Sequence, residues 1–237
     1  MPFNRIFLFI FIASLTVILT ASCQKTATDL PTDIAPSDRN FTEKLTFLGD
    51  STTAHMQQRS SLKPQQIWAT KNRYLNLDSR ITYAKIIAPD TGKEEPIADV
   101  AARLHPSYLV ITLGVDYGVY YYRDRPEEFT HYYEKLLSAI QQASPDTVLV
   151  LQSIFPVAKS SQVITNAMIQ KANQLVSDIA QRRGIIYVDQ TPILADENGF
   201  LRPEFCFSED GIHLTAKAYD AILEHLATLQ AEIGGHA

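Results

Sequence analysis

The sequence predicts a three-layer α/β/α fold built on a flavodoxin-like parallel sheet of about five strands. Short apolar runs alternate with helical segments of ten or more residues, which is typical of strands joined by crossover helices. Several of these runs contain almost no polar residue, as expected for strands covered on both faces. A hydrophobic content of 46% with 20% charged residues fits a globular domain.

In the first half of the chain, the elements are predicted from apolar runs and turn residues. A buried strand is expected where the apolar run 45–48 breaks at Gly49. The next apolar segments predict a short strand at 67–69 and a hairpin or irregular strand pair at 75–87. Asp90-Thr91-Gly92-Lys93 predicts a turn, and Pro96 is placed to begin an amphipathic helix.

The second half gives clearer periodicity. Strands are predicted at 108–113, 147–151 and 185–188 from continuous apolar runs. Helices are predicted at 126–143, at 163–183 with its stop at Gly184, and at 214–229, with a turn at 196–199 before the last one.

The front of the chain is predicted to be a targeting segment, residues 1–23. Arg5 supplies a positive charge, and the uncharged run Ile6 to Leu19 is short for a spanning helix. It ends in Leu19-Thr20-Ala21-Ser22-Cys23, which resembles the bacterial lipobox whose cysteine is lipidated, although Thr20 stands where leucine is commonest. Lipidation at Cys23 would tether the protein outside the cytoplasm. Ordinary cleavage near Ser22 and retention as an uncleaved anchor are the alternatives.

Residues 24–42 are polar, lack periodicity and predict a flexible tether, which leaves 43–237 as one folded domain. A net charge of −5 and a pI near 5.7 argue against binding to nucleic acid. The chain has two cysteines, Cys23 and Cys206, which excludes a disulfide framework. A buried structural role for Cys206 is favoured over a catalytic one.

Two short stretches carry reactive residue types. Gly49-Asp50-Ser51 follows the first strand, and ligands of open α/β sheets bind at the carboxyl ends of strands. Near the other end of the chain, Asp210 and His213 have the spacing that lets a carboxylate orient an imidazole within a loop. Helix capping by Asp50-Ser51-Thr52 and an exposed loop position for His213 are the structural alternatives.

Taken together with Gly114-Val115-Asp116 after a later strand, these stretches resemble the SGNH, or GDSL-type, hydrolase superfamily. The resemblance covers about residues 43–230. It implies a serine esterase in which Ser51 is the nucleophile, His213 the general base and Asp210 its orienting carboxylate. It also implies an ester substrate, with acetylated saccharides and acyl esters as the classes, and no cofactor.

The oxyanion hole departs from the family pattern. The family has Gly-x-Asn where this chain has Gly114-Val115-Asp116, and an ionised Asp116 would repel a developing oxyanion. A protonated Asp116 would donate a hydrogen bond, which requires burial to raise its pKa. The family's oxyanion glycine has Gly92 as one candidate, and the glycine-free region Trp68-Ala69-Thr70 as another.

Two functions therefore follow: an exported, membrane-tethered serine ester hydrolase, or a degenerate hydrolase fold that binds a surface polymer or a partner with little turnover. His55 is expected either to line the pocket or to face solvent. The run Tyr117, Tyr120, Tyr121 and Tyr122 is expected to supply a sugar or acyl platform in part and helix packing for the rest. No spacing in the sequence predicts a metal site or a nucleotide-binding loop.

Overall fold

The computed structural model describes residues 40–207 and 209–235. Cys23 and the rest of the predicted targeting segment lie outside the described residues, as does most of the predicted tether. The last residues of that tether belong to the fold. Phe41 is buried and packs its ring edge-on against Tyr108, with 5.4 Å between the centroids. The folded domain therefore begins before residue 43.

The main sheet is parallel and has the strand order β2-β1-β5-β6-β7. Its strands are β1 (Leu45–Gly49), β2 (Ile67–Trp68), β5 (Tyr108–Thr112), β6 (Val148–Gln152) and β7 (Ile186–Val188). This is the flavodoxin-like order, in which the direction of winding reverses between the first strand and the third strand of the sheet along the chain, here β1 and β5. The predicted fold class is confirmed.

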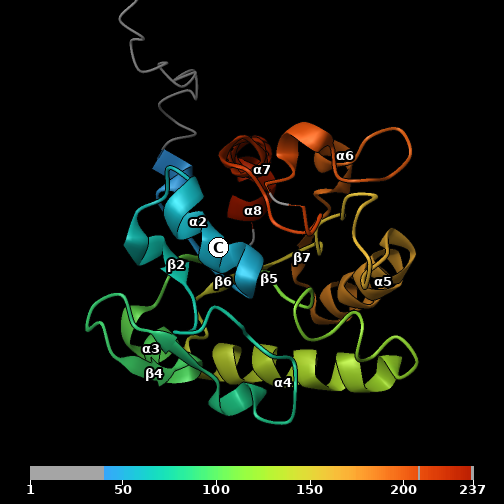
Figure 1. Cartoon of the computed structure of the whole chain (residues 1–237). Helices are drawn as coiled ribbons and strands as arrows, with labels where there is room; N and C mark the ends of the chain where they lie inside the picture. Colours follow the sequence, from blue (N-terminus) through green and yellow to red (C-terminus); the bar gives the residue numbers. More distant parts are fainter. Residues whose placement is uncertain (1–39, 208, 236–237) are drawn as a thin grey trace, which may run out of the picture. The chain divides into compact units, whose positions relative to one another are not determined.

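Helices cover both faces of this sheet (Figure 1). The helices are α2 (Ser51–Arg59), α3 (Ile97–Leu104), α4 (Pro126–Ala143), α5 (Asn166–Arg183), α6 (Thr191–Leu194), α7 (Ala216–Thr228) and α8 (Gln230–Gly234). Short 3-10 turns lie at Pro64–Gln66, Ile81–Tyr83 and Pro203–Phe205. No helix among the described residues is long and apolar enough to cross a membrane.

The core has two halves because side chains alternate across the buried strands. Leu48 and Leu109 point into the cluster formed with α3, α4 and α5. Phe47 and Val110 point into the cluster formed with α7 and α8, to which α2 contributes Met56. The strands thus bury both faces, as their unbroken apolar sequence predicts.

The hairpin is displaced from its predicted position. Residues 75–87 were expected to contain the strand pair, but the pair is β3 (Lys85–Ile87) with β4 (Glu94–Pro96), joined through the predicted 90–93 turn. Leu75 and Leu77 are buried one by one as anchors of an irregular loop. Leu75 and Leu77 are two residues apart, as buried side chains on one face of a strand are, and this spacing led to the wrong position for the strand pair.

Helix boundaries follow local capping. The helix predicted to begin at Val163 begins at Asn166, because the Thr165 side chain accepts the N–H of Met168. It ends at Gly184, which is left-handed with φ 64°, as predicted. The last long helix begins at Ala216, after Thr215, and not at Leu214.

Candidate active site

The reversal point of the sheet brings the predicted site residues together. Ser51 begins α2 directly after β1, and Asp116 follows β5, which is the strand next to β1. Gly49 makes this crowding possible. A Cβ atom at position 49 would lie 2.2 Å from the carbonyl oxygen of Thr112 on β5 and 2.2 Å from the Thr53 hydroxyl. Packing therefore requires a glycine two residues before Ser51.

Ser51, His213 and Asp210 form a hydrogen-bonded chain. The Nε2 atom of His213 lies 3.2 Å from the Ser51 hydroxyl, and its Nδ1 atom lies 2.7 Å from Asp210 Oδ2. Ser51 is buried, whereas the side chains of His213 and Asp210 are partly exposed. This is the order of contacts that a serine nucleophile, a base and an orienting carboxylate require.

The loop 210–213 is shaped by its own sequence. Asp210 Oδ1 accepts the backbone N–H groups of Ile212 and His213, which folds the loop around the carboxylate. Gly211 is left-handed with φ 73°, and a Cβ there would lie 2.9 Å from the Ser160 hydroxyl. The turn therefore requires glycine between the acid and the imidazole.

Asp116 accepts two hydrogen bonds from Ser51. Its Oδ1 accepts the Ser51 hydroxyl at 2.7 Å, and its Oδ2 accepts the Ser51 backbone N–H at 2.8 Å. That N–H is the first of α2, where a carboxylate is also favoured by the helix dipole. Asp116 thus occupies the backbone donor that an oxyanion at Ser51 would use.

Asp50 anchors the loop after β5 through hydrogen bonds. It is fully buried, and its Oδ2 accepts the N–H groups of Gly114 and Val115, each at 2.9 Å. The hydroxyl of Thr52 donates to its Oδ1 at 3.1 Å. Asp50 thereby fixes the loop that carries Asp116, rather than capping α2, because its side chain accepts no N–H of that helix.

Burial and mutual repulsion favour protons on this carboxylate pair. Desolvation and then the charge of Asp116 raise the pKa of Asp50 to about 7, against the opposing effect of the N–H donors. Burial also raises the pKa of Asp116, against the hydrogen bonds from Ser51 and the charge of His213. A neutral Asp116 is the form that can donate toward an oxyanion.

Gly92, the glycine candidate for the oxyanion hole, and Gly114 of the Gly114-Val115-Asp116 stretch both have their N–H groups already bound. The Gly92 N–H donates to the carbonyl of Ala88 at 2.8 Å inside the β3–β4 turn, so that group is already used in the hairpin. The Gly114 N–H is bound to Asp50. Gly114 itself has φ 135° and packs against Ile154 and Phe129, which leaves no room for a side chain. Both glycines therefore serve backbone geometry in this structure.

His55 lies against the catalytic histidine candidate and does not simply face solvent. Its ring meets that of His213 edge-on, with centroids 4.4 Å apart. Its Nδ1 atom is buried and has no hydrogen-bond partner among the described residues. Partial burial, and then the charge of His213, lower the pKa of His55 to about 4. A neutral His55 thus supports the ring of His213 without adding a positive charge.

The other singled-out residues divide as expected between packing and surface. Trp68 and Tyr122 are buried, while Tyr120 and Tyr121 are exposed. Cys206 is half-buried and pairs with Leu214 in an antiparallel bridge. Within 40–207 and 209–235, no group of three His, Cys, Asp or Glu residues is placed to hold a metal.

Sequence reasoning missed two contacts that position the site. The Tyr219 hydroxyl donates to the carbonyl of Thr52 at 2.6 Å and joins α7 to α2. The double contact of Asp116 with Ser51 was missed as well, because the sequence places Asp116 at the site without showing its orientation. No local pattern encodes either contact, since each joins segments far apart in the chain.

The fold and this arrangement define an SGNH-type hydrolase domain. Residues 47–221 match the model of the GDSL-like lipase/acylhydrolase family, and the chain belongs to that family. A search of curated proteins found no match.

One solved structure with a TM-score above 0.5 supports the fold, and two others are reported only as similar proteins. A Streptococcus pneumonia protein described as a candidate platelet activating factor has 17% identity and a TM-score of 0.53, over 83% of this chain and 91% of that one. A peptidoglycan O-acetylesterase has 13% identity and a TM-score of 0.48, over 58% of this chain and 41% of that one. A carbohydrate esterase family 3 protein from Talaromyces cellulolyticus has 20% identity and a TM-score of 0.43, over 60% and 65%. This chain thus matches less than half of the peptidoglycan O-acetylesterase chain.

Proposed function

We propose that the protein is an exported, membrane-tethered serine ester hydrolase acting on carboxylic esters. The observation that carries this proposal is the contact chain from the Ser51 hydroxyl through His213 to Asp210, with atom separations of 3.2 and 2.7 Å. Membership of an acylhydrolase family supports it. Export and tethering rest on the N-terminal sequence that ends in Cys23.

The reaction follows from the contacts. Ser51 Oγ attacks the ester carbonyl carbon while His213 Nε2 takes the hydroxyl proton. The tetrahedral intermediate collapses, His213 returns that proton to the leaving alcohol, and an acyl-Ser51 ester remains. Water then attacks the acyl carbon with His213 again as base, which releases the carboxylic acid and restores Ser51. Asp210 keeps the ring in the tautomer with Nδ1 protonated.

The protonation state of Asp116 controls whether Ser51 can attack the ester. In the resting arrangement the Ser51 hydroxyl donates to Asp116 at 2.7 Å, a shorter contact than the 3.2 Å to His213. Attack requires that the hydroxyl turn to His213 and that the Ser51 N–H face the substrate oxygen. Protonation of Asp116 allows both, because a neutral carboxyl holds these donors less tightly and can itself donate to the oxyanion.

Hydrolysis of p-nitrophenyl acetate by the purified protein tests the proposal. Ser51→Ala and His213→Ala are each expected to lower kcat by about a thousandfold or more, since the members of such a chain act as a unit. Ser177→Ala, at a half-buried position of α5 and outside the Ser51–His213–Asp210 contacts, is the matched control and is expected to hydrolyse the ester like the wild type. Hydrolysis by Ser51→Ala at the wild-type rate would contradict the proposal.

The second candidate is a degenerate hydrolase that binds without turnover. It is favoured by one observation, the occupation of the Ser51 N–H and hydroxyl by Asp116. The two candidate functions predict different effects of Ser51→Ala on the rate of ester hydrolysis. A hydrolase loses its activity, whereas a binding protein has no activity to lose. A wild-type rate no greater than that of Ser51→Ala at every pH between 4 and 9 would favour this candidate.

A further inference from the structure

Two loops flank the candidate nucleophile because of the strand order. The neighbours of β1 in the sheet are β2 and β5, and the chain leaves both at the edge where Ser51 lies. The loop after β2 and the loop after β5 also touch, since the N–H of Leu77 donates to the carbonyl of Tyr117 at 3.2 Å. Tyr117 follows Asp116 directly. A ligand whose ester group lies at Ser51 and whose other end extends toward β2 therefore meets the loop after β2, which we call the β2 loop.

Exposed aromatic side chains gather on these two loops and on the loop before Asp210. Among the described residues, the exposed large apolar side chains are Tyr74, Tyr83, Tyr120, Tyr121, Val163 and Phe207. Four of the six are tyrosines of the segments after β2 and β5. Exposed tyrosines offer a ring face for C–H groups and a hydroxyl for hydrogen bonds, and they are unlike an apolar acyl-chain tunnel.

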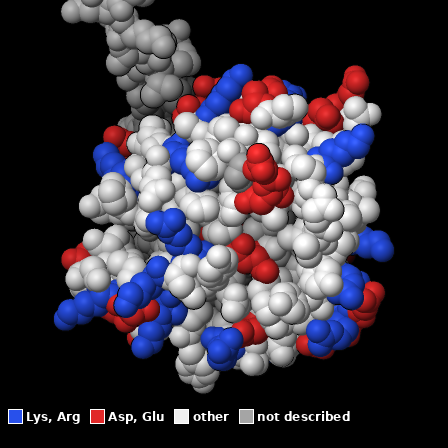
Figure 2. Space-filling view, viewed as in Figure 1, with Lys and Arg blue, Asp and Glu red and all other residues white. Residues whose placement is uncertain are grey.

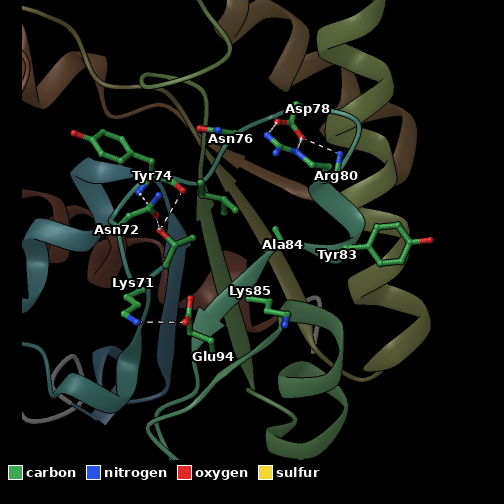
Figure 3. A pocket seen from close by; sticks show the side chains of 12 residues that line it. Lys71, Asn72, Tyr74, Asn76, Asp78, Arg80, Tyr83, Ala84, Lys85 and Glu94 are labelled. Atoms are coloured by element: carbon green, nitrogen blue, oxygen red, sulfur yellow. Dashed lines mark hydrogen bonds and ion pairs between the residues drawn. The ribbon is translucent and has the colours of Figure 1, made fainter.

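The β2 loop and the β3–β4 hairpin line an open pocket of about 510 Å³, which we call the loop pocket (Figure 3). It is lined by polar side chains, including Asn72, Asn76 and Lys85, and by Leu75 and Tyr74. The volume lies in the range of about 300–1,000 Å³ that small-ligand sites occupy. The lining combines charged and amide groups with the carbon surface of tyrosine and aliphatic side chains, which suits the hydroxyl groups and C–H faces of a sugar better than a fatty acyl chain.

The loop that forms this pocket is fixed by its own hydrogen bonds. The Thr70 hydroxyl lies 2.9 Å from Asn72 Oδ1 and 3.1 Å from the carbonyl of Tyr74. Arg73 is held in a left-handed conformation with φ 66°, and its N–H donates to the carbonyl of Thr70. A non-glycine residue in this conformation is a strained feature of the kind found at ligand clamps.

Charges in the loop pocket are mostly paired, while hydrogen-bond donors are left over. Figure 3 shows the Asp78–Arg80 pair at one end and the Lys71–Glu94 pair at the other, with separations of 2.6 and 3.7 Å. In the described part of the chain, the Lys85 ammonium and the Asn76 amide have no hydrogen-bond partner, and both line the pocket. Over the face shown in Figure 2, charges of both signs are interspersed, which does not favour a polyanion. The occupant should therefore be rich in hydroxyl groups and nearly neutral.

Resting on the function proposed above, we infer that the loop pocket binds the saccharide part of an O-acylated oligosaccharide whose ester lies at Ser51. The Asn76 amide and the Lys85 ammonium hydrogen-bond to sugar hydroxyls, and Tyr74 lines the same pocket. The proposal deepens the esterase function by naming the substrate class. It also predicts that the β2 loop determines the preference of the enzyme for polymeric substrates over small esters.

The test compares chain lengths on chemically O-acetylated glucan, xylan and chitin oligosaccharides, from one to six sugar units. For at least one backbone, kcat/KM of the wild type is expected to rise with length by about tenfold or more. Lys85→Ala and Asn76→Ala are expected to remove most of that rise, since a hydrogen bond from a charged donor contributes about a factor of ten or more in affinity. Both variants should hydrolyse p-nitrophenyl acetate like the wild type.

Lys93→Ala is the matched control, because Lys93 is an exposed lysine of the same β3–β4 hairpin and does not line the loop pocket. Calorimetric titration of Ser51→Ala with the hexamers gives a readout that needs no turnover, and Lys85→Ala in that background is expected to weaken binding by about tenfold. Rates that do not change with length on any of the three backbones would overturn the inference, as would Lys85→Ala and Lys93→Ala variants with equal affinity. Loss of the esterase function alone would instead show in the p-nitrophenyl acetate assay.

Discussion

At the scale of single residues, Asp116 decides what the site can do. Asp116 stands where the family has an asparagine. Its carboxylate accepts both the hydroxyl and the backbone N–H of Ser51. Three groups face it: Ser51 at the start of α2, His213 from the loop before α7, and Asp50 at the end of β1. Burial favours its neutral form and His213 favours its charged form. The proposed mechanism therefore predicts an activity that depends on how protons are distributed within this cluster.

Replacing Asp116 by Asn is expected to raise kcat on p-nitrophenyl acetate at pH 8 by about tenfold to a hundredfold. The Asn amide can donate to an oxyanion at any pH, and one such donor contributes about that much or more. The wild type should be active in a narrow window, because His213 must be neutral while Asp116 is protonated. Asp116→Asn should widen this window toward alkaline pH, as measured by a pH–rate profile.

A broad wild-type plateau from pH 6 to 9 would contradict the donor role of Asp116. A large loss of kcat in Asp116→Asn would show that the carboxylate has a role of its own in the reaction. Asp124→Asn, an exposed carboxylate on the same loop, serves as the control and should leave the profile unchanged.

Asp50 makes stability depend on pH. The pKa of its carboxyl rises from the ordinary value of 3.8 to about 7 in the fold, so the folded chain binds a proton that the unfolded chain releases. Stability from this group is therefore present below pH 4 and falls as the pH rises from about 4 to 7.

Asp50→Asn is expected to remove this dependence, since an amide oxygen can still accept the N–H groups of Gly114 and Val115. The free energy of unfolding at pH 8 should then exceed that of the wild type, by about 1–4 kcal/mol. Urea unfolding at pH 5 and pH 8 measures it, with the exposed Asp146→Asn as control. Equal pH dependence in Asp50→Asn and wild type would contradict a protonated Asp50.

At the scale of elements, prediction worked where burial or capping is local. The helix 126–143 was predicted with its observed bounds, because Pro126 begins it and its apolar face has the helical period. The hairpin was misplaced because isolated buried anchors such as Leu75 and Leu77 copy the alternation of a strand. The three residues Ser51, Asp210 and His213 could be predicted from turn motifs. The contacts of His55 with His213 could not, since they arise from packing between α2 and a distant loop.

Gly49 links element packing to the site. Gly49→Ala is expected to lower stability by about 1–3 kcal/mol, because the new methyl group would overlap the Thr112 carbonyl of β5 and the Thr53 hydroxyl of α2. The overlap should also move Ser51 and slow its acylation. Gly92→Ala is the contrasting variant. It meets open space, is strained only by its positive φ, and should leave the rate of Ser51 acylation unchanged.

At the scale of the whole molecule, the site joins the two ends of the domain. Ser51 and His213 are 162 residues apart in the chain, and their contact depends on how α7 packs on α2. The bond from the Tyr219 hydroxyl to the Thr52 carbonyl fixes that packing from within the core. Folding of the complete domain must therefore precede activity.

A pair of tyrosines tests this claim. Tyr219→Phe removes the buried hydrogen bond from α7 to α2 and is expected to cost about 0.5–1.5 kcal/mol. Tyr133 is also fully buried, but its hydroxyl has no partner among the described residues, so Tyr133→Phe should be neutral or stabilising. Thermal unfolding of the two variants gives the comparison. A Tyr133→Phe variant less stable than Tyr219→Phe would contradict the assignment of the bond.

The most direct measurement is to treat the protein with a fluorophosphonate at neutral pH and locate the adduct by mass spectrometry. The catalytic chain proposed here predicts a single phosphonylated residue, Ser51, and no labelling in His213→Ala. Labelling at another residue, or an unmodified Ser51 after prolonged exposure in the folded wild type, would contradict it.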